Sequence, residues 1–221
     1  MKKIFLSIMV TAVLSITALA QKVTLAVSAG ISYANVFLKA DSNKVEGLGS
    51  KNGFTGGISA NIPISKYFSF QPAVNFLQKG AKIQSGSPLF INGTSTITLN
   101  YIEVPLNLMF NTDHRAIDKK ADDFFFGIGP SFAFGASGEI KEKDAKDSVI
   151  TTKIKFGSSD NDNIKGVDIG ANVVIGCLFF NNAFFSVNYN IGFNNLLNSN
   201  EIRWHNNYLG FKVGYSFGNR K

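Results

Sequence analysis

Large apolar residues and small or polar residues alternate along most of the chain after residue 20. In residues 68–76, for example, the even positions carry Phe, Phe, Pro, Val and Phe, whereas the odd positions carry Ser, Gln, Ala and Asn. A period of two residues is that of a β-strand, whose successive side chains point to opposite faces. Connections rich in Gly, Asn, Asp and Ser separate the alternating segments. The pattern predicts strands near residues 23–38, 54–64, 68–78, 97–110, 124–136, 167–180, 184–194 and 204–217.

The second face of these segments distinguishes lipid from water as the surrounding solvent. A soluble antiparallel sheet usually turns charged residues to water, but here the second face carries mostly Gly, Ala, Ser and Asn. Such residues fit the interior of a narrow eight-stranded barrel, which is just wide enough for side chains to fill. The large apolar residues then point outward into lipid. We therefore expect an all-β fold: a closed, antiparallel, up-and-down transmembrane β-barrel of about eight strands.

Charged residues avoid the predicted strands. Of the 22 basic and 15 acidic residues, three fall within them, Glu103, Asp168 and Lys212, and all three lie on the small, polar face. A buried charge is costly unless it is paired. We therefore predict a structural charge network in the lumen, with a Glu103–Lys212 contact at mid-depth and Asp168 nearer the extracellular mouth. A proton or ion path through these residues is the alternative interpretation.

The first twenty residues have the pattern of a secretory signal peptide. Lys2 and Lys3 precede an apolar run, and Ala18-Leu19-Ala20 matches the small-x-small cleavage pattern. The run is short for a transmembrane helix, which needs roughly 20 apolar residues. We expect a cleaved signal peptide at residues 1–20 and one barrel domain at residues 21–221. Without the two lysines, the net charge of +7 falls to +5.

The lengths of the connections fit the asymmetry of outer-membrane barrels, which have short periplasmic turns and longer extracellular loops. The N-terminus is expected in the periplasm. The predicted turns are then residues 65–67, 111–123 and 181–183, and the predicted loops are residues 39–53, 79–96, 137–166 and 195–203.

Three prolines, Pro72, Pro105 and Pro130, lie inside predicted strands. Proline has no N–H to donate to a neighbouring strand, and so each proline removes one hydrogen bond from the ladder. We predict β-bulges at these sites, where the ladder would already be interrupted. An open sheet with these segments at its edges is the alternative.

Several short motifs follow one another in a characteristic order. Residues 101–106 read Tyr-Ile-Glu-Val-Pro-Leu, residues 188–192 read Asn-Tyr-Asn-Ile-Gly, and residues 209–217 read Leu-Gly-Phe-Lys-Val-Gly-Tyr-Ser-Phe. With Gly56-Gly57, Phe70-Gln71-Pro72 and Val167-Asp168-Ile169-Gly170, this order resembles the PorT-like outer-membrane β-barrel domain family of Bacteroidetes over essentially the whole mature chain. The resemblance implies an integral outer-membrane barrel and makes Pro105 a family feature. It brings no catalytic residues.

Residues that could carry chemistry are few. Pairing of His205 with Asp160 or Asp162 would only loosely mimic an acid–base dyad, and His114 lies in a predicted turn. The Asp-Asn-Asp-Asn run at residues 160–163 lacks the glycine and the distal glutamate of a calcium loop. We predict no enzyme activity and no catalytic, cofactor-binding or metal site.

The remaining residues of note have structural interpretations. Cys177, the single cysteine, excludes an intramolecular disulfide framework and is expected to face lipid. Trp204, Tyr208 and Tyr215 suit the aromatic girdles at the membrane interfaces. The basic excess is spread along the chain without a basic patch, and no nucleic-acid partner is indicated.

The sequence therefore predicts an outer-membrane protein with a side-chain-filled lumen that has a structural or partner-binding role through its loops or turns. A narrow channel or transporter, and a soluble periplasmic barrel that binds an apolar ligand, are the alternatives. The expected partners are outer-membrane lipid, the barrel-insertion machinery and a protein at the loops or periplasmic turns. Insertion signals commonly end on an aromatic residue, whereas four residues follow Phe217.

Overall fold

The computed structural model describes residues 23–40, 43–44, 48–83, 93–112, 122–143, 148–157, 163–197 and 202–217. These residues form ten strands: β1 (Thr24–Ala40), β2 (Asn43–Lys44), β3 (Leu48–Pro63), β4 (Phe68–Ile83), β5 (Thr94–Asn111), β6 (Asp123–Lys143), β7 (Val149–Ile154), β8 (Val167–Leu178), β9 (Ala183–Gly192) and β10 (Ile202–Phe217). In the described part of the chain, no helix has the length and apolar character needed to cross a membrane.

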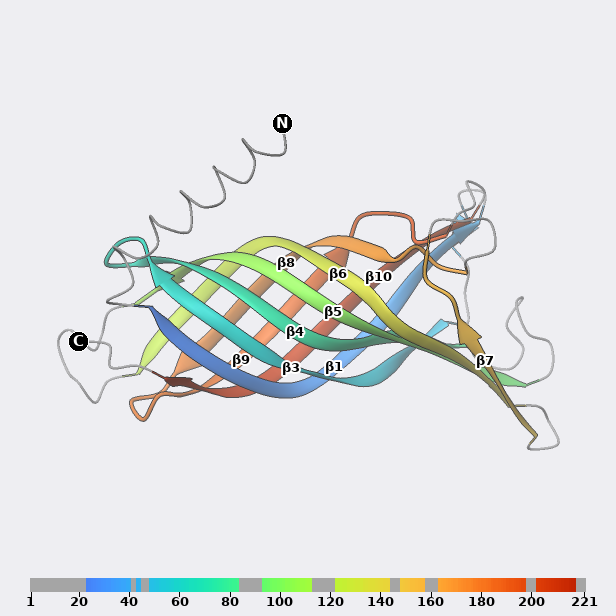
Figure 1. Cartoon of the computed structure of the whole chain (residues 1–221), viewed down its shortest axis with the longest axis horizontal. Helices are drawn as coiled ribbons and strands as arrows, with labels where there is room; N and C mark the ends of the chain where they lie inside the picture. Colours follow the sequence, from blue (N-terminus) through green and yellow to red (C-terminus); the bar gives the residue numbers. More distant parts are fainter. Residues whose placement is uncertain are drawn as a thin grey trace, which may run out of the picture.

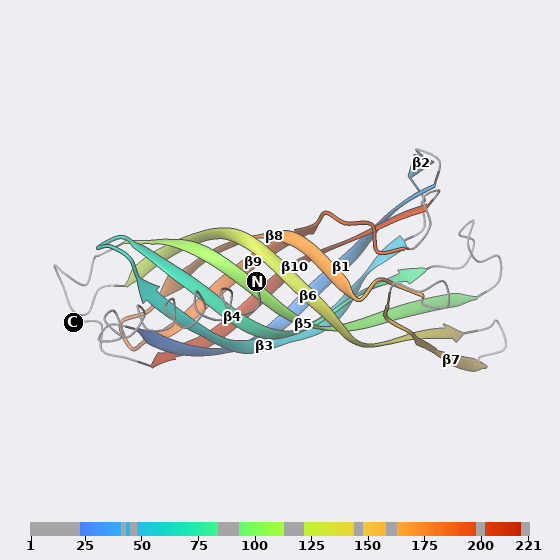
Figure 2. The same ribbon diagram turned by 45° about the horizontal axis from the view of Figure 1, so that its top comes forward.

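Eight of the strands close into a ring. Neighbouring strands pair antiparallel in the order β10-β9-β8-β6-β5-β4-β3-β1, and β1 also pairs with β10 along its whole length, from Leu25 opposite Phe217 to Ala40 opposite Ile202. The short strands β2 and β7 pair with the ends of β1 and β6 and lie at one end of the barrel (Figures 1 and 2). The prediction of a closed, up-and-down antiparallel barrel is confirmed.

The two ends of the barrel differ. At one end, which we call the turn end, β3 and β4 are joined by residues 64–67 and β8 and β9 by residues 179–182. The third connection at the turn end, residues 112–122 between β5 and β6, is longer. The other end, the loop end, carries β2 and β7 and the connections of residues 84–93, 155–166 and 193–201. In outer-membrane barrels, short turns face the periplasm and long loops face the outside.

The outer surface of the ring is apolar near the turn end, as the alternation predicts. The exposed side chains there belong to large apolar residues from every strand of the ring, among them Val27, Ile31, Ile58, Val74, Leu108, Phe126, Ile128, Ile175, Tyr189 and Val213. A surface of this size made of Phe, Ile, Val and Leu is favourable against lipid and unfavourable against water. We call it the lipid belt.

The lipid belt ends at the same level on neighbouring strands. Asn35 of β1 is opposite Asn207 of β10, and Asn100 of β5 is opposite both Gln78 of β4 and Ser137 of β6. These polar residues continue the outward-facing rows that carry apolar residues below them. On β5 the apolar row runs over residues 102–110, which is close to the roughly 9–11 residues that a tilted strand needs to cross a bilayer.

Beyond this level the strands continue out of the belt as a sheet. We call the segments 78–83, 94–100, 137–143 and 149–154 the projecting sheet. They are paired side by side as the loop-side parts of β4, β5, β6 and β7. The sequence prediction placed most of these residues in loops, and this is wrong. On β5 and β6 the projecting sheet follows the opposite pattern, with Thr98 and Glu139 outside and Leu99 and Ile140 inside.

A register shift separates the two parts of β6. Tyr101 is opposite Gly135 and Asn100 is opposite Ser137, so Ala136 is an extra residue on β6. Such a β-bulge reverses the parity of the residues that follow it. Odd-numbered residues of β6 face the lumen before Ala136, whereas Glu139 and Lys141 face outward after it.

The predicted β-bulges at the prolines are wrong. Pro72 is opposite Leu106, Pro105 is opposite Ser131 and Pro130 is opposite Ala171, and the register is the same on both sides of each proline. The pairs next to Pro72 in the β4–β5 ladder and next to Pro105 in the β5–β6 ladder are missing without an inserted residue, whereas the β6–β8 ladder is continuous through Pro130. The loss of one N–H donor therefore does not change the register, because the long paired segments on either side of each proline keep the two strands aligned.

The lumen as candidate functional site

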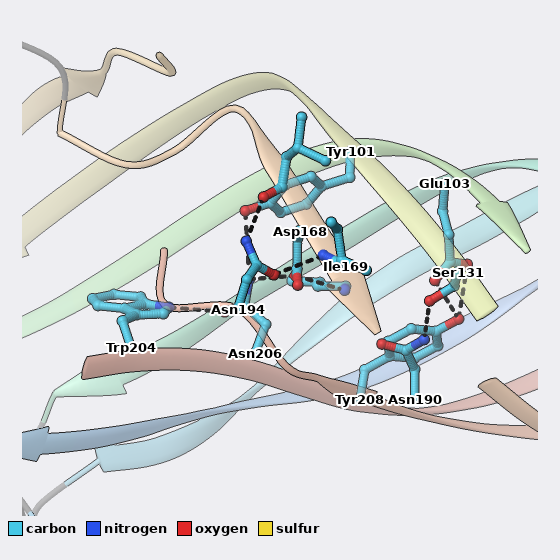
Figure 3. A network of polar contacts seen from close by, with 12 residues as sticks. Tyr101, Glu103, Ser131, Asp168, Ile169, Asn190, Asn194, Trp204, Asn206 and Tyr208 are labelled. Atoms are coloured by element: carbon cyan, nitrogen blue, oxygen red, sulfur yellow. Dashed lines mark hydrogen bonds and ion pairs between the residues drawn. The ribbon is translucent and has the colours of Figure 1, made fainter. Parts of the chain in front are cut away.

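An ion pair lies in the centre of the lumen. Lys79 of β4 and Asp168 of β8 face each other across the barrel, with Nζ 3.0 Å from Oδ2, and both side chains are almost completely buried. Asn206 of β10 donates to the same carboxylate oxygen at 3.0 Å and to the Tyr101 hydroxyl at 3.4 Å. Figure 3 shows Tyr101, Asp168 and Asn206 converging from three different strands. The carboxylate therefore has a counter-ion and a neutral donor, as a buried charge requires.

Two tyrosines enclose the lysine of this pair. Lys79 Nζ lies 5.5 Å from the ring centroid of Tyr101 and 5.3 Å from that of Tyr208. A cation against the face of an aromatic ring is attracted by the ring quadrupole. Both rings are fully buried, and they fill the lumen on either side of the ammonium group.

A second acidic residue lies next to this group. Tyr208 donates its hydroxyl to the Glu103 carboxylate, whose two oxygens are 2.9 and 3.1 Å away, and Asn75 donates to Glu103 at 3.5 Å. Glu103 and Tyr208 point toward each other in Figure 3. Through Tyr208, the carboxylate of Glu103 is connected to the Lys79–Asp168 pair. We call Lys79, Tyr101, Glu103, Asp168, Asn206 and Tyr208 the central layer.

Above the central layer, toward the loop end, the lumen is filled with apolar side chains. Leu99 is completely buried, and Ile97 is nearly so. The cluster also includes residues that follow β7 and β9 in the chain, since Ile164 and Leu196 fold back into the mouth of the barrel. The buried members are Ile83, Ile97, Leu99, Tyr101, Ala133, Ile154, Ile164 and Leu196. Side chains therefore close the loop-end mouth over the central layer.

Below the central layer, toward the turn end, the lumen is polar and less densely filled. Asn172 donates to Asn107 at 3.0 Å, and Asn190 donates to Ser131 at 2.5 Å. A cavity of about 70 Å³ lies in this part of the lumen and reaches Thr24 and Ser216, near the ends of β1 and β10 at the turn end. Lys212 forms part of its wall.

The predicted lumen residues can now be placed. Glu103, Asp168 and Lys212 are 0%, 2% and 6% exposed, and all three face the interior. The direct Glu103–Lys212 contact is not formed in the described part of the chain, because Glu103 is bound by Tyr208 and Asn75. Lys79, which was assigned to a loop, is the partner of Asp168. Its position four residues after Asn75, on the same parity, was the signal that could have placed it in the lumen.

The expected aromatic girdle is partly wrong. Tyr208 belongs to the central layer, and Trp204 packs against the apolar cluster at the loop-end mouth, so neither faces lipid. Both have the even parity of Lys212, and this parity indicates an inward position. Tyr215 is 44% exposed on the outer surface, as expected. Cys177 lies opposite Phe124 and Phe185 in the outward-facing row, which is also the predicted orientation.

The described residues contain no group of three or more His, Cys, Asp or Glu side chains that could hold a metal ion. His205 is half-buried in the outward row of β10, opposite Phe37 of β1. Asp160 and Asp162, the candidate acidic partners of His205, lie outside the described residues, as does His114. The polar groups that the structure does describe in the lumen are charged, amide and hydroxyl groups, and they form hydrogen bonds and ion pairs with one another.

A ring of antiparallel strands with an apolar belt outside and a polar lumen defines an outer-membrane β-barrel protein. The chain belongs to the outer membrane protein beta-barrel domain family, whose model matches residues 19–198. It resides in the outer membrane, as the sequence pattern predicts.

Solved barrels of similar architecture come from several bacteria. Neisserial surface protein A has 15% identity and a TM-score of 0.44, and the match covers 86% of this chain and 96% of that one. OprG from Pseudomonas aeruginosa has 10% identity and a TM-score of 0.47, with coverage of 89% and 96%. The attachment invasion locus protein Ail of Yersinia pestis has 13% identity and a TM-score of 0.39, with coverage of 88% and 98%. A comparison with curated protein sequences finds no match.

Proposed function

We propose that this protein is a non-conducting, non-catalytic barrel that anchors the projecting sheet and the loops outside the membrane, where they bind a partner. The observation that carries the proposal is the central layer. Tyr101 and Tyr208 are 0% and 1% exposed, and they enclose Lys79 between them. An eight-stranded barrel has little room in its lumen, and here bulky, hydrogen-bonded side chains occupy it at the junction of the lipid belt and the projecting sheet.

The channel alternative is disfavoured by the same arrangement. The cavity on the turn side is lined by residues below the central layer, and the described loop-side half of the lumen is filled by the apolar cluster. An ion would have to separate the Lys79–Asp168 pair and displace two buried rings to pass. Breaking a buried, hydrogen-bonded ion pair is strongly unfavourable.

Conductance in a planar lipid bilayer tests the proposal. The purified, folded barrel should give no stable conductance steps at moderate voltage. Replacing both Tyr101 and Tyr208 with alanine removes the two rings and should produce small steps. Steady ohmic openings of the unmodified protein would contradict the proposal, whatever the double variant does.

The projecting sheet supports the partner-binding part of the proposal. Within the described residues, β7 pairs with β6 alone, and Val149 and Ile150 of β7 are 57% and 62% exposed. An unpaired strand edge with exposed apolar residues is a site at which another chain can add a strand. A photo-crosslinking amino acid at Val149 should capture a discrete partner on intact cells, whereas the same group at lipid-facing Ile128 should not. Identical products from both positions would contradict a partner at β7.

The finer features of this proposal come from the sequence. We infer that residues 1–20 are removed as a signal peptide, that the turn end faces the periplasm, and that the protein belongs to the PorT-like group of Bacteroidetes barrels. The signal pattern, the short turns and the order of the motifs support these inferences. N-terminal sequencing of protein purified from membranes should begin at Gln21.

A further inference from the structure

Lys212 has an unusual environment for a lysine. It lies on the lumen side of β10, opposite Gly30 of β1 and Ser186 of β9, and it is 6% exposed. Its neighbours in the wall are small residues, so the ammonium group is surrounded by space. Within the described residues, Lys212 has neither a hydrogen-bond partner nor an ion-pair partner.

The two carboxylates of the central layer, Asp168 and Glu103, are bound by other residues. Asp168 accepts from Lys79 and Asn206, and Glu103 accepts from Tyr208 and Asn75. The field of Glu103 reaches Lys212, but Glu103 does not line the cavity. A buried ammonium group without an acceptor is costly. An acceptor from outside the protein would therefore be stabilised beside it.

The cavity next to Lys212 can hold such an acceptor. Its volume is about 70 Å³, and a single water occupies roughly 10–15 Å³ on this measure, so the space suits a small anion or a few waters. Among the described residues that line the cavity, Lys212 is the one with a charged side chain. The other polar side chains are amides and hydroxyls that can donate hydrogen bonds, including Asn61, Asn107, Asn188 and Ser186. The cavity extends to Thr24 and Ser216, and so a ligand would enter from the turn end.

We propose that this cavity binds a small anion, a carboxylate or an inorganic monoanion, with the Lys212 ammonium group as its charge partner and the surrounding amides and hydroxyls as its hydrogen-bond donors. The sign of the wall charge selects an anion over a cation. The volume selects species of the size of formate, chloride or bromide. Binding is independent of conduction, because the central layer closes the lumen above the site.

Thermal unfolding in detergent, followed by gel mobility, tests the proposal with formate as the probe. Formate replaces a sulfonate too bulky for the cavity, at constant ionic strength. A ligand that binds the folded state raises the midpoint in proportion to the logarithm of its concentration, by roughly 3–6 °C for each tenfold increase above the dissociation constant. The unmodified protein should show this rise.

Two variants with the same change of charge locate the effect. Lys212→Met should abolish the rise, whereas Lys66→Met, which removes an exposed lysine in the 64–67 turn, should leave it unchanged. An equal rise in Lys212→Met would place the anion elsewhere and overturn the proposal. The absence of a rise in the unmodified protein would overturn it as well.

A crystal soaked in bromide gives a second, structural readout. The unmodified protein should show anomalous scattering in contact with Lys212 Nζ, and Lys212→Met should lack it. A cavity that holds only water in the bromide-soaked, unmodified crystal overturns the proposal.

Discussion

Strands β5 and β6 have lipid outside them near the turn end and water outside them near the loop end. The pattern of inward-facing and outward-facing side chains reverses where the surroundings change. Below Asn100, Phe110, Leu108 and Ile102 of β5 face outward, and Glu103 and Asn107 face inward. Above it, Thr96 and Thr98 face outward, and Ile97 and Leu99 are buried inside. The lower part is organised for lipid outside, and the upper part is organised for water outside.

The comparison shows what each part uses as its core. In the lipid belt, apolar burial comes from the bilayer, and the lumen can be polar provided its groups bind one another. In the projecting sheet, water returns to the outer surface, so the apolar side chains must gather inside, as in a soluble barrel. The central layer lies at the junction and combines both, since Tyr101 contacts the apolar cluster on one side and Lys79 on the other.

The largest effect is expected at this junction. Replacing Lys79 with methionine leaves Asp168 buried without its counter-ion, and this should lower the free energy of unfolding by about 3–5 kcal/mol. Urea unfolding in lipid vesicles, followed by fluorescence of the single tryptophan, Trp204, measures it. The double variant Lys79→Met/Asp168→Leu should recover most of the loss. A double variant no more stable than Lys79→Met would contradict the ion-pair explanation.

The apolar core of the projecting sheet is tested by Leu99→Ala. A completely buried leucine should cost about 2–5 kcal/mol when truncated, because the cavity it leaves cannot collapse fully. Thr98→Ala, one residue away on the outer face, is the matched control and should change stability by about 0.5 kcal/mol or less. Equal losses in the two variants would mean that this part of β5 has no apolar interior.

The lipid belt is tested by adding the same charge on both sides of its boundary. Ile128→Lys, in the middle of the outward row of β6, should cost roughly 2–4 kcal/mol. Thr98→Lys, in the outward row above the boundary, should be nearly neutral. If both lysines were tolerated equally in vesicle unfolding, Ile128 would not face lipid.

The smallest effect is expected from loss of one hydroxyl in the lumen. Tyr208→Phe removes the donor to Glu103 and should cost about 1–3 kcal/mol, since the carboxylate stays buried. Tyr189→Phe makes the same chemical change on the outer surface, where the side chain is 45% exposed, and should be close to neutral. A larger loss in Tyr189→Phe would contradict the assignment of the two faces.

The alternation of residues was enough to predict the lipid belt and the ring. It predicted that Val27, Ile31 and Phe126 face outward and that Glu103 and Lys212 face inward, because a strand has one strict period and the two solvents differ sharply. The prediction failed where the solvent changes. Thr96 was assigned to a loop, whereas β5 begins at Thr94 and so includes it.

The contacts in the lumen were harder to predict than its orientation. Parity places Lys212, Glu103 and Asp168 on one face, but which of them meet depends on tilt and on how strands far apart in the ring face each other. Lys79 was missed because the predicted strand ended at residue 78 and the predicted loop began at residue 79. Gly80 is needed within β4 itself: its φ is 145°, and a Cβ atom there would lie 1.9 Å from the carbonyl oxygen of Ile97.

The most direct test of the inverted pattern measures lipid contact residue by residue along the outer face of β5. With Cys177 replaced by serine, a fluorophore on single cysteines at positions 96, 98, 102, 104, 106 and 108 is exposed to brominated lipids in reconstituted vesicles. We expect strong quenching at positions 102–108, centred near the bilayer midplane, and an abrupt loss at 98 and 96. Quenching that continues through position 96, or that is absent at 104 and 106, would contradict the inverted pattern.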